Sequence, residues 1–273
     1  MTAFRAACVQ LRSSDDVAQN IEVASDLIRE ARAKGADFIA TPENTTLMAA
    51  DGGAKLDKTF GEDADPALPA FRALAEELSA WLLIGSLAIK TDATKTANRS
   101  FLIDPKGRVA ARYDKIHLFD TDPGSGESYR ESNTVAGGHR AVTADLPWGK
   151  LGMTICYDLR FPQLYRRLAK AGAFLLSVPS AFTETTGKAH WHVLLRARAI
   201  ENGAFVIAPA QGGVHANGRA TYGHSLIVAP WGEILAEAGT EPGVIVAEID
   251  PAAVTSARSR VPSLTHDREF EGP

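Results

Sequence analysis

Two short segments of this chain each occur twice, and these repeats constrain the fold more than any other feature of the sequence. Ser100-Phe-Leu-Ile-Asp-Pro-Lys-Gly107 returns as Ser225-Leu-Ile-Val-Ala-Pro-Trp-Gly232, and Gly35-Ala-Asp-Phe-Ile-Ala-Thr-Pro42 returns as Gly172-Ala-Phe-Leu-Leu-Ser-Val-Pro179. Apolar strands that end at proline can resemble one another by chance. If the repeats instead mark a duplicated β-rich unit, they predict two similar sheets, related by an approximate two-fold axis and covered by helices.

Hydrophobic periodicity along the chain predicts strands that alternate with helices. The expected helices span 15–34, 66–80, 162–171 and 188–202, and the first would be capped by Ser14 or Asp15 and ended by Gly35. The expected strands span 4–11, 37–41, 82–89, 98–104, 108–113, 151–156, 174–178, 204–208, 224–229, 233–236 and 244–249. A long polar loop is expected over 120–138, and a polar tail after residue 249. No linker-like segment interrupts the chain, so we predict one α/β domain over residues 1–273.

The composition excludes several classes of protein. The chain has 273 residues, of which 45% are apolar, which is enough for a buried core and too apolar for a disordered chain. Its 29 basic and 33 acidic residues include no long Lys/Arg block, which argues against a nucleic-acid or membrane-surface partner. No apolar run reaches the roughly 18 residues of a membrane span, and the N-terminus lacks the pattern of a signal peptide. Two cysteines, Cys8 and Cys156, cannot form a disulfide framework, so we expect a soluble cytoplasmic protein.

Three reactive side chains fall at the ends of predicted strands. Glu43 lies just beyond strand 37–41, Lys115 follows strand 108–113, and Cys156 ends strand 151–156. Sites in α/β sheets collect outside the carboxyl ends of strands, because backbone groups there face a crevice. We therefore expect these three side chains to converge on one crevice.

A carboxylate, an ammonium and a thiol together support nucleophilic chemistry. The carboxylate can act as the base that turns the thiol into the stronger thiolate nucleophile. The ammonium favours the thiolate and donates to the oxyanion that forms when sulfur attacks a carbonyl carbon. The backbone N–H of Tyr157, next to the sulfur at a turn, is a natural second donor.

Taken one at a time, each of these residues also has an ordinary structural interpretation. A cysteine at a strand end is usually a small buried hydrophobe, and we assign that role to Cys8, inside the first strand. Glu43 could be a carboxylate at a helix N-terminus or a loop charge, and Lys115 a solvated strand-end charge. A thiol–histidine hydrolase is also open, since the chain has seven histidines, but no papain-type or caspase-type pattern surrounds Cys156.

No pattern predicts a metal or an organic cofactor. His190 and His192 do not have the spacing of a helical metal pair, and no cluster of cysteine or aspartate completes a site. Gly124-Ser-Gly126 neither follows a strand nor opens a helix, as a dinucleotide-binding loop would.

Three motifs in this order resemble the nitrilase superfamily of carbon–nitrogen hydrolases. They are Thr41-Pro-Glu-Asn44, Tyr113-Asp-Lys-Ile-His-Leu-Phe-Asp120 and Gly152-Met-Thr-Ile-Cys-Tyr-Asp-Leu-Arg-Phe-Pro162, whose Glu43, Lys115 and Cys156 match that family's triad. The resemblance spans nearly the whole chain. It implies a four-layer α-β-β-α sandwich and association through helices into a homodimer or larger homo-oligomer. It also implies that Glu131, in Tyr129-Arg-Glu-Ser-Asn133, lies beside the triad and helps to position the substrate amide; otherwise Glu131 is a loop charge.

Two further segments narrow the resemblance within the superfamily. Ala189-His-Trp-His-Val-Leu-Leu-Arg-Ala-Arg-Ala-Ile-Glu-Asn202 and Tyr222-Gly-His-Ser-Leu-Ile-Val-Ala-Pro-Trp-Gly232 resemble the branch that hydrolyses deaminated glutathione, to which the omega-amidases are close. His192 is a departure, because that branch usually has glutamate there, and it could alter specificity if it touches substrate. True nitrilases carry Trp-Glu after the nucleophile, whereas Tyr157-Asp158 follows here.

These observations predict a thiol-dependent amidase that hydrolyses a small amide, such as a 2-oxo-acid or deaminated-glutathione-type amide, through a cysteine thioester and without a cofactor. Arg160 is a candidate for binding an acidic group of the substrate; its alternative role is an ion pair with Asp158 or Glu201. The alternative functions are a nitrilase, an acyl transferase, or a catalytically silent binding protein of the same fold.

Overall fold

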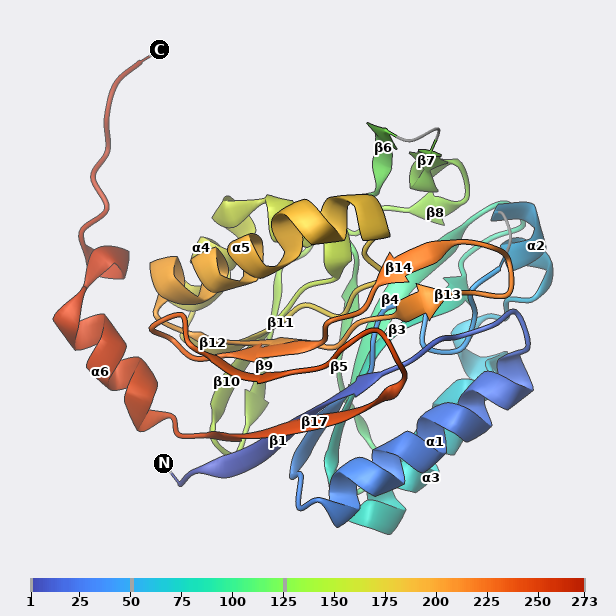
Figure 1. The fold of residues 1–273 in the computed structure, drawn as a ribbon, viewed down its shortest axis with the longest axis horizontal. Helices are drawn as coiled ribbons and strands as arrows, with labels where there is room; N and C mark the ends of the chain where they lie inside the picture. Colours follow the sequence, from blue (N-terminus) through green and yellow to red (C-terminus); the bar gives the residue numbers. More distant parts are fainter. Residues whose placement is uncertain (1, 50–51, 125–126, 273) are drawn as a thin grey trace.

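Two β-sheets lie face to face, and helices cover the outer side of each (Figure 1). This computed structural model describes residues 2–49, 52–124 and 127–272. The arrangement is the predicted four-layer α-β-β-α sandwich with two mixed sheets.

The first sheet has the strand order β17-β1-β2-β3-β4-β5, and β8 pairs with β4 outside this path. Its strands are β17 (Gly243–Ile249), β1 (Phe4–Gln10), β2 (Phe38–Ala40), β3 (Trp81–Lys90), β4 (Thr96–Ile103), β5 (Val109–Asp114) and β8 (Val135–Ala136). The second sheet has the order β16-β15-β12-β11-β10-β9. Its strands are β16 (Ile234–Glu237), β15 (Leu226–Val228), β12 (Phe205–Ala208), β11 (Ala173–Ser177), β10 (Gly149–Met153) and β9 (Val142–Leu146).

The two sheets share one pairing pattern, as the internal repeats predict. In the first, β17 is antiparallel to β1, β1-β2-β3 are parallel, and β4 and β5 follow antiparallel. In the second, β9 is antiparallel to β10, β10-β11-β12 are parallel, and β15 and β16 follow antiparallel. One repeat pair forms the β4–β5 and β15–β16 hairpins. The other leads into β2 and β11 through Gly35 and Gly172, whose φ angles of 86° and 97° suit glycine after a helix.

Helices complete the layers. Helices α1 (Val17–Ala33) and α3 (Ala67–Leu78) pack on the first sheet, and α4 (Pro162–Lys170) and α5 (Glu184–Asn202) pack on the second. Successive side chains of β1 point to opposite faces of the sheet, so this one strand contributes to two cores. Ala6 and Cys8 belong to the core between the sheets, whereas Ala7 and Val9 belong to the core under α1 and α3. Cys8 is 0% exposed, which confirms its predicted core role.

Several predicted boundaries were wrong. Asp16, and neither Ser14 nor Asp15, caps α1 by accepting a hydrogen bond from the Gln19 N–H. Strand β10 ends at Met153, three residues before Cys156, and Cys156 itself cannot belong to a strand because its φ of 45° is left-handed.

Other segments contain more regular structure than their polar sequence indicated. The predicted loop 120–138 holds the hairpin β6 (Asp120–Gly124) and β7 (Glu127–Arg130) as well as β8; its residues 125–126 lie outside the described residues. The expected polar tail begins with helix α6 (Ala252–Arg260), which buries only Val254 and Ala257 and so gives little periodic signal. Besides short 3₁₀ helices, the remaining unpredicted elements are α2 (Gly52–Asp57), β9, and the short pair β13 (Gly212–Val214) and β14 (Ala220–Tyr222). Within the described ranges, no helix is both long and apolar enough to cross a bilayer.

Gly85 in β3 allows the chain before Glu43 to approach the first sheet closely. A Cβ atom added at Gly85 would lie 2.1 Å from the Thr41 carbonyl oxygen and 2.5 Å from that of Pro42. We expect Gly85→Ala to destabilise the protein by about 1–3 kcal/mol, the usual effect of overpacking, because the obstructing atoms are backbone. Urea denaturation measures this free energy. Gly61→Ala is the control, since a Cβ there meets nothing within 4 Å; equal stability of the two variants would contradict the prediction.

Candidate active site

The structure brings the three strand-end residues of the sequence analysis to one cavity of about 660 Å³. Glu43 follows β2, Lys115 follows β5, and Cys156 begins a 3₁₀ helix (Cys156–Arg160) after β10. Glu131, in a 3₁₀ turn after β7, lines the same cavity. Since β2 and β5 belong to the first sheet and β10 to the second, the cavity lies where the two sheets meet.

A buried ammonium holds two carboxylates at the centre of this site. Lys115 is 2% exposed, and its Nζ donates to Glu43 Oε1 at 2.8 Å and to both Glu131 oxygens at 2.8 and 3.1 Å. The Asn98 side-chain amide donates to the same two carboxylates at 2.9 and 3.1 Å, and the Phe119 N–H donates to Glu131 at 2.7 Å. Burial by itself lowers the pKa of Lys115, but the charges of Glu131 and Glu43 raise it well above its ordinary value. The lysine is therefore a fixed positive charge.

Glu43 is held in its ionised form. Burial by itself would raise the pKa of this carboxyl group, but Lys115, through its charge and hydrogen bond, outweighs that effect. Hydrogen bonds from the Cys156 thiol and from the Ala181 N–H, at 2.9 Å, add to the stabilisation. The result is a pKa of about 2, so Glu43 is a carboxylate at neutral pH.

Cys156 lies on a strained turn against Glu43. Its left-handed φ of 45° is uncommon for a residue with a side chain, and such backbone strain is often found at nucleophiles presented on sharp turns. Its N–H donates to the Pro179 carbonyl at 3.0 Å, and its side chain lines the cavity although the residue is only 7% exposed. Burial and the negative charge of Glu43 raise the thiol pKa, while Lys115 opposes them. The resting pair is thus a neutral thiol and an ionised carboxylate.

The turn after Cys156 is fixed by Asp158, which is 0% exposed. Its carboxylate accepts hydrogen bonds from the Tyr113 hydroxyl at 2.6 Å, the Ile155 N–H at 2.9 Å and the His117 N–H at 3.0 Å. No acceptor among the described residues forms a hydrogen bond with the Tyr157 N–H. It therefore remains available beside the sulfur.

Apart from Arg130, which pairs with Asp122, the cavity lining carries two cations that the sequence analysis missed, Lys55 on α2 and Arg219 before β14. Arg219 donates from Nη2 to the Ala181 carbonyl at 2.8 Å, but its buried Nε has no acceptor among the described residues. Lys55 donates to the Asn44 side chain at 3.1 Å, and burial lowers its pKa. No sequence motif marks either residue, since each comes from a short element that packing alone positions.

Arg160 lies outside the described lining of the cavity. Its guanidinium stacks over the rings of Phe182 and Tyr157, at 5.2 and 6.0 Å, and its Nη1 lies 3.3 Å from His190 Nδ1. Among the described residues, Arg160 forms neither of its two expected ion pairs. The Asp158 carboxylate instead accepts hydrogen bonds around its own turn, and Glu201 pairs with Arg198.

His192 also lies away from the described cavity lining. It approaches His224 and Glu237 instead, a grouping that sequence spacing could not show because its members come from three separate segments.

Comparisons with known proteins agree with this geometry. The family model described as carbon-nitrogen hydrolase matches residues 5–259. A deaminated glutathione amidase from Synechocystis is 42% identical over 270 residues, covering 97% of this chain and 98% of the relative. The structure of Nit3 from Saccharomyces cerevisiae, a member of branch 10 of the nitrilase superfamily, has a TM-score of 0.88 at 30% identity and covers 98% of this chain and 97% of that one.

A third comparison concerns an active-site cysteine. A glutamate-to-glutamine variant of an amidase from Nesterenkonia, with covalent addition of the acetamide moiety of fluoroacetamide at its active-site cysteine, has a TM-score of 0.83 at 25% identity, covering 97% of this chain and 94% of that one. The chain described here therefore belongs to the carbon–nitrogen hydrolase family of the nitrilase superfamily, in which it is a thiol-dependent amidase.

Proposed function

We propose that Cys156 is the nucleophile of an amide hydrolysis and that Glu43 is the general base and general acid of each step. Glu43 takes the thiol proton as the sulfur bonds to the amide carbon, and the carbonyl oxygen becomes an oxyanion. When the C–N bond breaks, Glu43 returns the proton to the leaving nitrogen, and ammonia or an amine departs from a thioester. Glu43 then takes a proton from water as the water oxygen attacks the thioester carbon. When the C–S bond breaks, Glu43 gives this proton to the departing sulfur, which restores the Cys156 thiol and releases the carboxylic acid product.

The observation that carries this proposal is the arrangement of the thiol, the carboxylate and the ammonium in one buried cluster. A neutral thiol hydrogen-bonds an ionised carboxylate, and a buried ammonium contacts that carboxylate at 2.8 Å. Lys115 and the Tyr157 N–H are positioned to stabilise the oxyanion, each contributing on the order of 3 kcal/mol to the transition state. Because burial and Glu43 raise the thiol pKa, we propose that the thiolate forms in the attack step itself, as the oxyanion near Lys115 begins to form.

Glu131 has two proposed roles. Its two oxygens bind Lys115 Nζ at 3.1 and 2.8 Å and so fix the ammonium toward the cavity centre. Because it also lines the cavity, we propose that it accepts a hydrogen bond from the substrate amide nitrogen.

We propose that the substrate is a small amide that carries a carboxylate, such as a 2-oxo-acid amide or a deaminated-glutathione-type amide. The support comes from two cations of the cavity lining. Burial destabilises the charge of Lys55, and the buried Nε of Arg219 has no acceptor among the described residues. An incoming carboxylate satisfies both. The name of the Synechocystis relative points to the same class. Arg160 acts at most indirectly, by packing against Phe182 of the cavity wall.

We also propose that the whole chain is one hydrolase domain that works as a cytoplasmic homodimer or larger homo-oligomer. Both cysteines are unpaired thiols, which suits a reducing compartment. Helix α5 exposes Val193 at 68% and Ile200 at 54%, two turns apart on its outer side, which suits a surface covered by a second copy.

The nucleophile is tested by Cys156→Ala, which we expect to abolish ammonia release from an amide panel while the circular dichroism spectrum stays native. Cys8→Ala is the matched control, since it removes the other thiol, sealed in the core at 0% exposure. Release of ammonia by Cys156→Ala at the wild-type rate would contradict the mechanism.

The same panel separates the alternative functions. Turnover of nitriles in preference to amides would indicate a nitrilase. Product formation only with an amine acceptor such as hydroxylamine would indicate an acyl transferase. Absence of any turnover, with Cys156 alkylated by iodoacetamide no faster than Cys8, would indicate a silent homologue.

The pH profile tests the charge state of Glu43. Because its pKa is held at about 2, we expect kcat/KM for an uncharged amide to stay flat from neutral pH down to about pH 4. Circular dichroism across the range shows where the protein remains folded. An acid-side inflection between about pH 4 and 6, in protein that is still folded, would mean that the base has an ordinary or raised pKa.

The carboxylate preference is tested with Arg219→Gln and Lys55→Met. We expect each to lower kcat/KM about 10- to 100-fold for an acidic amide, as for loss of a hydrogen bond to a charged group, and less than about threefold for a neutral amide of similar size. The control is Lys188→Met, because Lys188 pairs with Glu184 on the surface of α5. An equal effect on both amides would show that the two cations are structural.

A further inference from the structure

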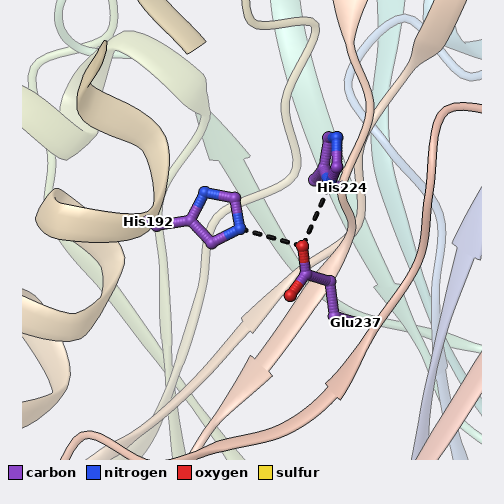
Figure 2. Close-up of side chains that lie close together, drawn as sticks. All are labelled: His192, His224 and Glu237. Carbon is purple, nitrogen blue, oxygen red and sulfur yellow. Dashed lines mark hydrogen bonds and ion pairs between the residues drawn. The ribbon is translucent and has the colours of Figure 1, made fainter. Parts of the chain in front are cut away.

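Outside the cavity, two imidazoles and one carboxylate converge from three parts of the second half of the chain. His192 lies on α5, His224 precedes β15, and Glu237 ends β16 (Figure 2). His192 Nε2 and His224 Nδ1 lie 3.0 and 2.9 Å from the same oxygen, Glu237 Oε1. One ligand atom of each residue lies within 4.8 Å of those of the other two.

The spacing suits a small tetrahedral cation. With metal–ligand bonds of about 2.0–2.1 Å, neighbouring ligand atoms of a tetrahedral site lie about 3.4 Å apart. The two contacts to Glu237 therefore need to open by only about half an ångström. The two imidazole rings, whose planes meet at 65° with centroids 5.6 Å apart, approach one another without stacking, as two ligands of one ion do.

Three residues around His224 hold its ring and its backbone in place. Tyr222 stacks on its ring at 4.4 Å, Trp191 Nε1 donates to its carbonyl at 2.8 Å, and its own N–H donates to the Gly239 carbonyl at 2.8 Å. Its φ of 52° is left-handed, a conformation that only a well-fixed backbone maintains in a residue with a side chain. At least one of the three side chains thus has a fixed position, which favours metal binding over a loose surface contact.

We propose that His192, His224 and Glu237 bind one divalent transition-metal ion of the zinc class. Two neutral imidazoles and one carboxylate are a borderline donor set that zinc accepts, and three protein ligands leave a fourth position for water. The side chains are 30%, 26% and 38% exposed, so that position faces solvent. Each neutral imidazole would bind the ion through the nitrogen that now donates to Glu237, so the proton on that nitrogen must move to the other ring nitrogen.

Such an ion would cross-link α5 to the β15–β16 hairpin. The link also reaches the cavity wall, because Trp191 packs on Phe182 at 5.1 Å and Phe182 lines the cavity. Zinc at this site would therefore stabilise the part of the cavity wall that contains Phe182, without contacting Glu43, Lys115 or Cys156.

Direct zinc binding tests the proposal, using untagged full-length protein that carries Cys156→Ala, so that no active-site thiol competes for the metal. Calorimetric titration with Zn²⁺ should give one ion per chain and a rise in Tm. His192→Gln can keep a hydrogen bond to Glu237 but supplies a poor ligand, and Glu237→Gln removes the charged ligand. Each should weaken zinc binding about tenfold or more.

The control is His139→Gln, because His139 is an exposed histidine between β8 and β9, and its zinc affinity should equal that of the parent. Co²⁺ gives a second measurement on the parent protein, where a tetrahedral site shows intense visible ligand-field absorption. Absence of stoichiometric Zn²⁺ binding, or binding that neither cluster variant weakens, would overturn the proposal and show a hydrogen-bonded cluster only. Neither result bears on amide hydrolysis, which uses other residues.

Discussion

The buried ammonium of Lys115 is the interaction on which the rest of the active-site structure depends. A charge removed from water is costly unless opposite charges and hydrogen bonds replace the solvent. Here Glu43 and Glu131 supply the charges, Asn98 and Phe119 donate to the same carboxylate oxygens that Lys115 contacts, and the Ala181 N–H donates to the other Glu43 oxygen. Loss of any one partner would leave a buried group unsatisfied. The same contacts that stabilise the cluster therefore fix its geometry.

The duplicated architecture explains why these groups meet. Each sheet has three parallel strands, and the segments after β2, β10 and β11 all reach the junction of the two sheets. Glu43 follows β2, and its carboxylate accepts from Ala181, which follows β11. Cys156 follows β10 and donates from its N–H to Pro179 after β11. The two repeats that end at Pro42 and Pro179 thus supply matching sides of one cavity.

The sequence was sufficient to predict the layers, most strands and the convergence of Glu43, Lys115 and Cys156, because apolar periodicity and strand-end chemistry are local signals. It was insufficient for groups that only tertiary packing places. Asn98 lies within a strand, and its position there does not reveal that its amide donates to two carboxylates. Asp158 lies in the turn after the nucleophile, and its position does not reveal that it accepts the hydrogen bonds that fix this turn. Lys55 and Arg219 come from short elements without periodicity. The left-handed φ of Cys156 was also not predicted, because cysteine has no preference for that conformation that a sequence pattern could reveal.

The central claim is that amide hydrolysis passes through a covalent bond to Cys156 within this charge cluster. Rapid acid quench of the wild-type enzyme with a turned-over amide, followed by peptide mass spectrometry, measures it directly. The account predicts the acyl mass on the peptide that contains Cys156, appearing together with the first equivalent of ammonia and disappearing as acid is released. Ammonia release with no acyl adduct on that peptide, under conditions where a thioester standard survives the quench, would contradict it.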